Sequence, residues 1–131
     1  MENSGLVEYK RVAYFEYDFA RDGGGVGDIE VEGDVIPSGA IIHDGMIHVK
    51  TAVLSGGSAT VAIKALTTED IKAATGKATY SLNAMLATVP VGSAASAIRV
   101  TSNITALTFT VAVAALTAGK ICVALEYYMT A

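Results

Sequence analysis

The chain has 131 residues, of which 52% are apolar, only 17% are charged and none is Trp. Its length suits a single domain, and a charged fraction below the usual ~25% predicts a surface partly covered by copies of itself or by a partner. A net charge of −4 without a basic patch excludes direct nucleic-acid binding, and the longest apolar run, Val111 to Leu116, is too short for a membrane-spanning helix.

The first eight residues are mostly polar and predict a flexible N-terminal arm, residues 1–8, ahead of a single β-sandwich domain over residues 9–131. The start of the chain lacks the basic region and apolar stretch of a secretory signal, so we expect synthesis and folding in a cytoplasm. Cys122 stands alone between Ile121 and Val123. This setting excludes an internal disulfide and favours a small buried hydrophobe over a reactive thiol.

Residues 9–19 alternate aromatic and polar side chains, a pattern typical of a β-strand. The apolar face consists of Ala13, Phe15, Tyr17 and Phe19. Glu16 and Asp18 share the opposite face. We expect the aromatic side chains to pack in the core or at a subunit contact, which is more common than a ligand platform.

Four glycines between Arg21 and Asp28 predict a loop, because glycine destabilises the interior of helices and strands. The G-x-G-x-x-G dinucleotide pattern fails, since Asp28 occupies the position of its last glycine. We prefer the loop to a calcium site through Asp22 and Asp28, because the calcium-binding nonapeptide that it resembles is one residue longer and occurs in repeats.

Acidic residues gather between positions 16 and 34. This segment has seven carboxylates against Arg21, a local charge of −6 (1 − 7), while the rest of the chain sums to +2 (8 − 6). Such a segment is either a solvated loop or a surface that faces a basic partner. The candidate interface residues are Glu16, Asp18, Asp22, Asp28, Glu30, Glu32 and Asp34.

A short strand is predicted over residues 29–36, and Pro37-Ser38-Gly39 predicts the turn that ends it. The stretch from Ala40 to Ala65 has the clearest period-two pattern in the chain. Ser55-Gly56-Gly57-Ser58 interrupts this pattern and predicts the tight turn of a β-hairpin. Asp44-Gly45 predicts a bulge or a second tight turn.

One short helix is predicted near residues 68–75, because hydroxyl and acidic residues open this segment and Gly76 closes it. Residues 80–87 predict either a helical turn or an irregular crossing, and strands follow over 97–102, 107–115 and 121–128. The pattern predicts a mainly all-β fold. We expect a two-layer antiparallel β-sandwich, or a jelly-roll-like fold, of about seven or eight strands.

Residues that carry chemistry are few. His43, Asp44 and His48 would bind zinc only if a bulge at Asp44 brought both histidines to one face. No serine lies in a G-x-S-x-G elbow, and no carboxylate pair has the apolar setting of a catalytic acid. We therefore expect no enzyme activity, no cofactor and no metal.

The order of turns and strands after residue 36 carries a family resemblance. Its motifs are Ile36-Pro37-Ser38-Gly39-Ala40-Ile41-Ile42, Ser55 to Ile63, the segment around Asp70, and Leu116 to Tyr128. This order resembles the head decoration, or cement, proteins of tailed bacteriophages, which are small β-rich proteins that bind the outside of a capsid shell and hold capsomers together. The motifs are turns and strands, so the resemblance transfers no site residue.

The resemblance implies a non-enzymatic structural virion protein on the capsid exterior, with the major capsid protein as its partner and no membrane or nucleic-acid contact. Symmetric, multivalent contacts suit a low-charge chain that forms a homo-oligomer, a dimer or trimer. Residues 1–8 and 16–34 are the expected capsid-facing parts. The alternatives are a phage tail or baseplate component, and a carbohydrate-binding β-sandwich with Tyr9, Tyr14 or Tyr128 as its aromatic platform.

Overall fold

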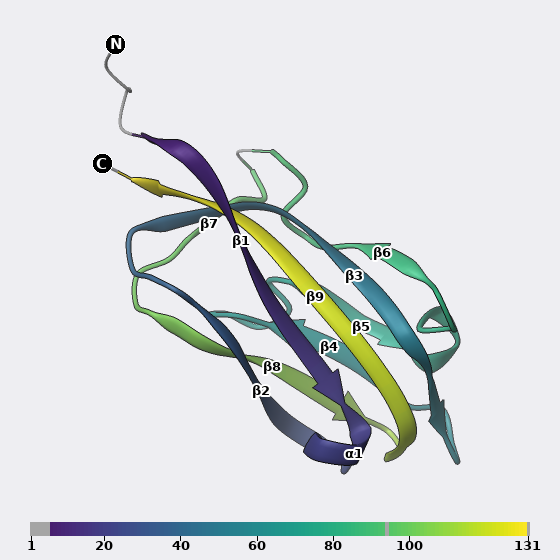
Figure 1. Ribbon diagram of the computed structural model, residues 1–131. Helices are drawn as coiled ribbons and strands as arrows, with labels where there is room; N and C mark the ends of the chain where they lie inside the picture. The colour runs from purple at the N-terminus through teal and green to yellow at the C-terminus, as the bar shows by residue number, and fades with distance from the viewer. Residues whose placement is uncertain (1–5, 94, 131) are drawn as a thin grey trace.

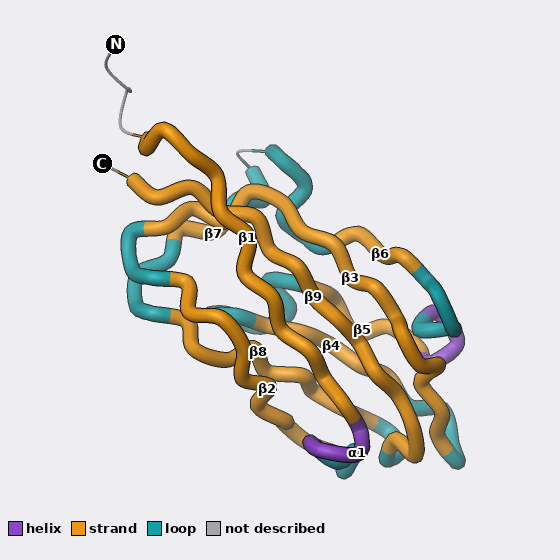
Figure 2. The backbone as a smooth tube through the Cα atoms, viewed as in Figure 1, coloured by secondary structure: helices purple, strands orange, loops and turns teal. Residues whose placement is uncertain are grey.

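The computed structural model describes residues 6–93 and 95–130, which are mostly strand (Figures 1 and 2). This described part contains nine strands, one α-helix and one 3-10 helix. They are β1 (Leu6–Asp18), α1 (Phe19–Asp22), β2 (Gly27–Ile36), β3 (Ala40–Ser55), β4 (Thr60–Lys64), β5 (Lys72–Gly76), η1 (Lys77–Thr79), β6 (Met85–Ala87), β7 (Ile98–Arg99), β8 (Ile104–Ala112) and β9 (Leu116–Thr130). Residues 6–8 of the predicted arm thus belong to β1, and residues 1–5 lie outside the described part.

The strands pair antiparallel in the order β5-β4-β8-β2-β1-β9-β3-β6, with β7 also on β3. β1 and β2 share a single pair, Phe15 with Gly33, and the sheet folds over at this seam. One side is the β1 layer, made of β1, β9, β3, β6 and β7. The other is the β8 layer, made of β2, β8, β4 and β5 (Figure 1). The prediction of a mainly antiparallel β fold is confirmed.

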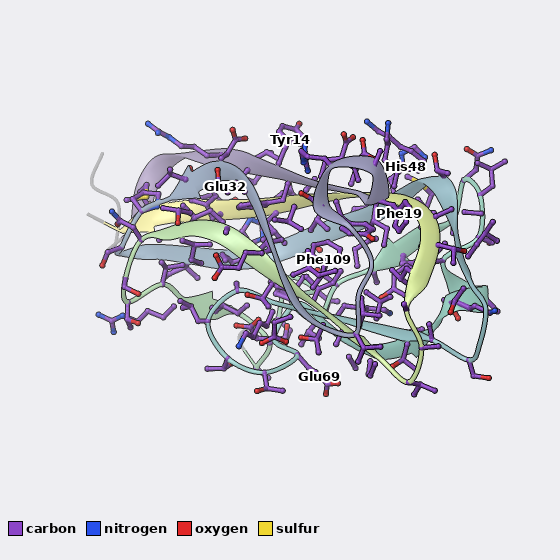
Figure 3. The ribbon with its side chains drawn as sticks, turned by 90° about the horizontal axis from the view of Figure 1, so that it is seen from below. Tyr14, Phe19, Glu32, His48, Glu69 and Phe109 are labelled. Carbon is purple, nitrogen blue, oxygen red and sulfur yellow. The ribbon has the colours of Figure 1, made fainter. Side chains whose placement is uncertain are left out.

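The core lies between the two layers and is built from alternate side chains of the long strands. The ring of Tyr17 in β1 stacks on that of Phe109 in β8, with centroids 5.4 Å apart, so the layers are in direct contact. Phe109 lies between them in Figure 3. The predicted apolar face of the first strand is confirmed for Ala13, Phe15 and Tyr17, which are buried, whereas Phe19 lies in α1 and is partly buried. The buried side chains of β9 alternate in the same way and are Ile121, Val123, Leu125 and Tyr127.

The predicted hairpin over residues 40–65 is wrong, although both of its strands exist. β3 pairs with β9 in one layer, whereas β4 pairs with β8 and β5 in the other. The glycine-rich segment between them crosses from layer to layer. Ser55 fixes the start of this crossing, because its hydroxyl donates to Ala115 O at 2.6 Å and accepts from Gly57 N at 3.2 Å.

The helix predicted near residues 68–75 is also wrong, because Lys72–Gly76 is strand β5. The Asp70 carboxylate accepts backbone N–H groups from Ala65, Leu66 and Thr67, at 2.6, 2.9 and 2.9 Å. These bonds close a tight loop in place of a helical turn. Ile71 is then fully buried, and its N–H donates to Ile63 O at 3.2 Å, which leads the chain into pairing with β4.

The remaining differences concern short segments. The register of β3 against β9 shifts between Ile42 and Asp44, so a bulge exists as predicted, but at His43-Asp44, one residue before Asp44-Gly45. Residues 80–87 form a crossing that ends in β6. Three short strands, β5, β6 and β7, raise the number of strands in the described part above the predicted seven or eight.

Candidate functional site

The seven predicted interface acids fall into two groups in the structure. Three of them, Glu16, Asp18 and Asp22, lie where β1 passes into α1. The other four, Asp28, Glu30, Glu32 and Asp34, occupy alternate positions of β2 and are exposed. The period-two spacing of β2 places Asp28, Glu30 and Glu32 on one face of the strand, whereas the register shift between Glu32 and Ile36 leaves Asp34 outside this alternation.

The acids of the first group are paired with cations. Glu16 binds Lys50 at 2.8 Å, and Asp18 lies 3.6 Å from Lys120. Asp18 also caps α1, because its carboxylate accepts from Ala20 N at 3.0 Å. These carboxylates are occupied by contacts within the chain and hold the β1–α1 corner together.

Asp22 is the most engaged of this group. Partial burial acts to raise its pKa, but hydrogen bonds from the Arg21 guanidinium and from Asp18 N, together with the Arg21 charge, outweigh burial and lower the pKa. The Arg21–Asp22 ion pair is 2.9 Å long. The adjoining loop is held as well, because the Tyr17 hydroxyl donates to Gly23 O and Leu116 N donates to Gly24 O at 2.7 Å.

The β2 acids differ in what they contact. Asp34 accepts from Tyr14 N at 2.9 Å and thereby closes the seam between β1 and β2. Asp28 accepts from the Thr110 hydroxyl at 2.8 Å. No ion pair within residues 6–93 and 95–130 involves Asp28, Glu30 or Glu32. These three residues form an acidic strip whose charge is not balanced by a paired cation.

A groove of about 280 Å³ adjoins the acidic strip on the outer face of the β8 layer. Its lining is rich in Thr and Ala and consists of Asp28, Thr60, Ala62, Ile63, Lys64, Thr68, Glu69, Ala74, Thr110 and Ala112. Glu69 has a left-handed backbone, with φ of 58°, and its carboxylate accepts from Ala74 N at 2.8 Å. Small side chains make a shallow floor here, which suits contact with a partner's surface.

The histidines do not form a metal centre. Although the bulge at Asp44 exists, no group of three or more metal-ligating side chains occurs among the described residues. The ring of His43 stacks on that of Tyr128 at 4.7 Å, and its Nε2 is buried without a hydrogen-bond partner. His48 lies opposite Cys122 of β9 on the outer side of the β1 layer. Among the described helices, none is long and apolar enough to cross a membrane.

The outer face of the β1 layer carries exposed apolar side chains, of which only Tyr14 was a candidate contact residue from the sequence. Val12, Tyr14, Met46 and Met85 are exposed there. Each looks like an ordinary isolated surface hydrophobe in the sequence, and only the strand register brings them together. Tyr14 and Tyr128 do not form one platform, because Tyr14 pairs with Ala124, four residues and roughly 13 Å along β9 from Tyr128.

No family model and no curated protein matches the chain. Solved structures of phage capsids contain chains with this fold. The chain matches one from the cyanophage Pam1 capsid asymmetric unit with a TM-score of 0.67 and 18% identity, over 98% of this chain and 89% of that chain. A chain of the acid-stable capsid of Helicobacter pylori bacteriophage KHP30 gives 0.61 and 16%, over 95% and 91%. One from the capsid of Ralstonia phage GP4 gives 0.58 and 16%, over 99% and 92%.

Proposed function

We propose that this chain is a structural protein of a phage virion that binds the outer surface of the capsid and bridges its subunits. The observation that carries the proposal is the match to chains of three phage capsids over almost the full length of both partners. Because about nine-tenths of each matched chain is covered, those chains are close to this one in size. A small chain within a capsid suits a role beside a larger shell protein.

The acidic strip of Asp28, Glu30 and Glu32 supplies the capsid-facing chemistry in this proposal. These side chains are exposed and have no cation partner within the described residues, so a basic capsid surface would gain Coulomb energy without breaking an existing pair. The adjoining groove offers small Thr and Ala side chains for close contact. Residues 1–8, the other expected capsid-facing part, are a second candidate for this contact.

Repetition of weak contacts explains how such a surface could stabilise a capsid shell. A single rim-type ionic contact contributes little, but many symmetric copies acting on one lattice add avidity without new contacts. The paired acids Glu16, Asp18 and Asp22 are assigned to the fold instead, because their cations lie within the same chain.

Fractionation of purified virions tests the location. The chain is expected in the head fraction by mass spectrometry, and its presence only on tails would favour a tail or baseplate component instead. Its absence from both fractions would refute a virion role.

Co-sedimentation with capsids lacking the chain tests the surface. The triple variant Asp28→Asn, Glu30→Gln and Glu32→Gln is expected to bind at least tenfold more weakly at low salt, and the difference should shrink as salt is raised. The matched control keeps the charge, with Asp28→Glu, Glu30→Asp and Glu32→Asp, and should bind like wild type. Unchanged binding by the neutral variant, even with residues 1–8 deleted, would overturn the assignment of this surface.

A further inference from the structure

We propose that the outer face of the β1 layer is a self-association surface, on which two copies of this chain pack face to face around a two-fold axis. This inference goes beyond the proposed function and does not depend on it, because it rests on the face itself. The occupant is a second copy of the chain, and the argument comes from register, exposed area and charge.

The register aligns the side chains of this face into rungs that cross four strands. One rung runs from Tyr14 through Ala124 and Met46 to Ala87 and contains no charged residue. The next rung consists of Glu16, Cys122, His48 and Met85. Tyr14 and His48 lie on the side of the β1 layer that faces away from Phe109, whereas Glu69 lies beyond the opposite layer (Figure 3). The apolar rung is therefore continuous and central on an outer surface.

The apolar side chains of this face are substantially exposed. Tyr14, Met46 and Met85 are 57%, 49% and 59% exposed. With Val12 they present roughly 400 Å² of apolar surface, within the range of the largest patch on a typical monomer, which is often functional. Water contact with this area is removed if another flat surface covers it.

The relief of the face is complementary to itself. Tyr14 borders a groove of about 430 Å³ that also includes Cys122, Gly33 and four charged residues, Glu16, Arg21, Glu32 and Lys50. A second groove of about 310 Å³ lies across Val12, Met46 and Ala124. Tyr14 stands beside the first groove, and a two-fold axis would let the ring of each copy enter a groove of the other.

The charges on this face favour an identical partner. Lys10 pairs with Glu126 at 2.9 Å, Lys50 with Glu16 and Lys120 with Asp18. These three pairs cancel within one copy, which leaves Asp44 and Glu32 as the groove-lining carboxylates without an ion pair in the described part of the chain. Like-charge repulsion between two copies is therefore limited to these residues. The acidic strip on β2 is the opposite case, because a two-fold contact there would bring six unpaired carboxylates together.

The dimensions of the face are adequate for a stable dimer. Three strands spaced by about 4.8 Å, each counted over about nine residues at about 3.4 Å, and the three residues of β6 beside them give roughly 500 Å² in projection. Side-chain relief makes the accessible area larger than the projection, and a standard interface buries about 800 Å² per partner. Face-to-face packing of sheets at a separation of about 10 Å is a common arrangement.

Light scattering coupled to size-exclusion chromatography is the first test. The chain of 13.5 kDa is expected to elute as a dimer of 27 kDa (2 × 13.5). Ala124→Lys and Met46→Lys each place a charge in the central rung and are expected to give monomers. The matched control Thr108→Lys, on the outer face of the β8 layer, should remain a dimer. Circular dichroism establishes that each variant is folded.

Cys122 provides a second test because it lies in the proposed interface. Burial raises the pKa of its thiol, so alkylation by a monofunctional maleimide is followed at mildly alkaline pH. At a total concentration ten times the dissociation constant, about one-fifth of the chain is monomeric, and alkylation should be about fivefold slower than at high dilution. Ala124→Lys should remove this concentration dependence. The variant Thr108→Cys in a Cys122→Ser background should show no concentration dependence of alkylation.

The outcomes separate this proposal from the capsid role. The inference of a dimer is overturned if the wild-type chain is monomeric at about 100 μM, because such a dimer would be too weak for an assembly contact. A dimer that survives both lysine variants overturns it as well. If the wild type is monomeric and the lysine variants lose capsid binding, the face contacts the capsid and the virion role stands. A chain that dimerises but does not bind capsids upholds the inference and counts against the proposed function.

Discussion

Substituting Gly33 tests the seam on which the two-layer fold depends. A Cβ atom at this position would lie 2.5 Å from Phe15 Cδ2, 3.0 Å from Phe15 Cα and closer still to Tyr14 O. Two of these three atoms belong to the backbone of β1, so a rotamer change cannot make room. Gly33→Ala is therefore expected to push β2 away from β1 by roughly 1 Å, the distance needed to restore ordinary contact.

The cost has two parts. Overpacking at a close backbone approach costs about 1–3 kcal/mol. Moving β2 also stretches the hydrogen bond from Tyr14 N to the Asp34 carboxylate, which contributes about 1 kcal/mol. Together they predict a loss of roughly 2–4 kcal/mol in the free energy of unfolding. For a domain of this size, this corresponds to a fall in Tm of about 10 °C.

Urea unfolding followed by circular dichroism measures this loss, with the m-value expected to stay unchanged. Gly25→Ala is the matched control, because a Cβ at Gly25 meets nothing within 4 Å. It should lie within about 0.5 kcal/mol of wild type. A Gly33→Ala protein as stable as this control would refute the close packing of the seam.

Three further predictions follow from contacts described above. Asp70→Ala removes the acceptor for three backbone N–H groups and should cost roughly 2 kcal/mol by urea unfolding, while Asp70→Asn should cost less because it keeps one acceptor oxygen. Burial raises the pKa of Tyr17 and Tyr80 to about 12, so absorbance titration should show both ionising there. Since unfolded tyrosine ionises near pH 10, their contribution to stability should be complete below pH 10 and lost between about pH 10 and 12. If the β1-layer dimer presents two acidic strips, Ala124→Lys should weaken capsid co-sedimentation by at least tenfold, and unchanged binding would show that one strip suffices.

The sequence predicted which side of each long strand faces the core, because alternation is a local property. Phe15 and Tyr17 of β1 and Val123 and Leu125 of β9 are buried as their spacing requires. It did not predict which strands become neighbours. β3 and β4 satisfy the same period-two pattern whether they pair with each other or with β9 and β8, so the pattern does not distinguish a hairpin from a crossing.

The helix-capping signals near Asp70 also led to a wrong prediction, the helix near residues 68–75. The residues around Asp70 match a helix start, but a carboxylate that can cap a helix can also close a loop by accepting nearby N–H groups. The burial of Ile71 in the core decides between them, and burial depends on residues far away in the chain. Gly33 gave no signal of its role, since its clash partners lie on β1.

The sequence shows where the acidic residues lie along the chain, but not which of them form ion pairs. Glu16 and Glu32 are equally acidic in the sequence, yet Glu16 is paired with Lys50 from β3, 34 residues away, and Glu32 has no ion pair in the described part. The apolar β1-layer face was missed for the same reason. Tyr14, Met46 and Met85 come from three strands, and only the register places them on adjacent rungs.

The two candidate surfaces differ in chemistry, and this difference bears on how the chain could bridge a shell. A neutral, apolar face can meet its own copy, whereas an acidic strip repels its copy and attracts a basic partner. If two copies pair through the β1 layer, the outer faces of both β8 layers stay uncovered, each with its own strip and groove. Such a dimer would offer two equivalent contacts to two capsid subunits. The second contact would then form at the high effective concentration set by the rigid dimer. The chain could bridge two capsid subunits because its self-association face and its acidic strip lie on different surfaces of one small fold.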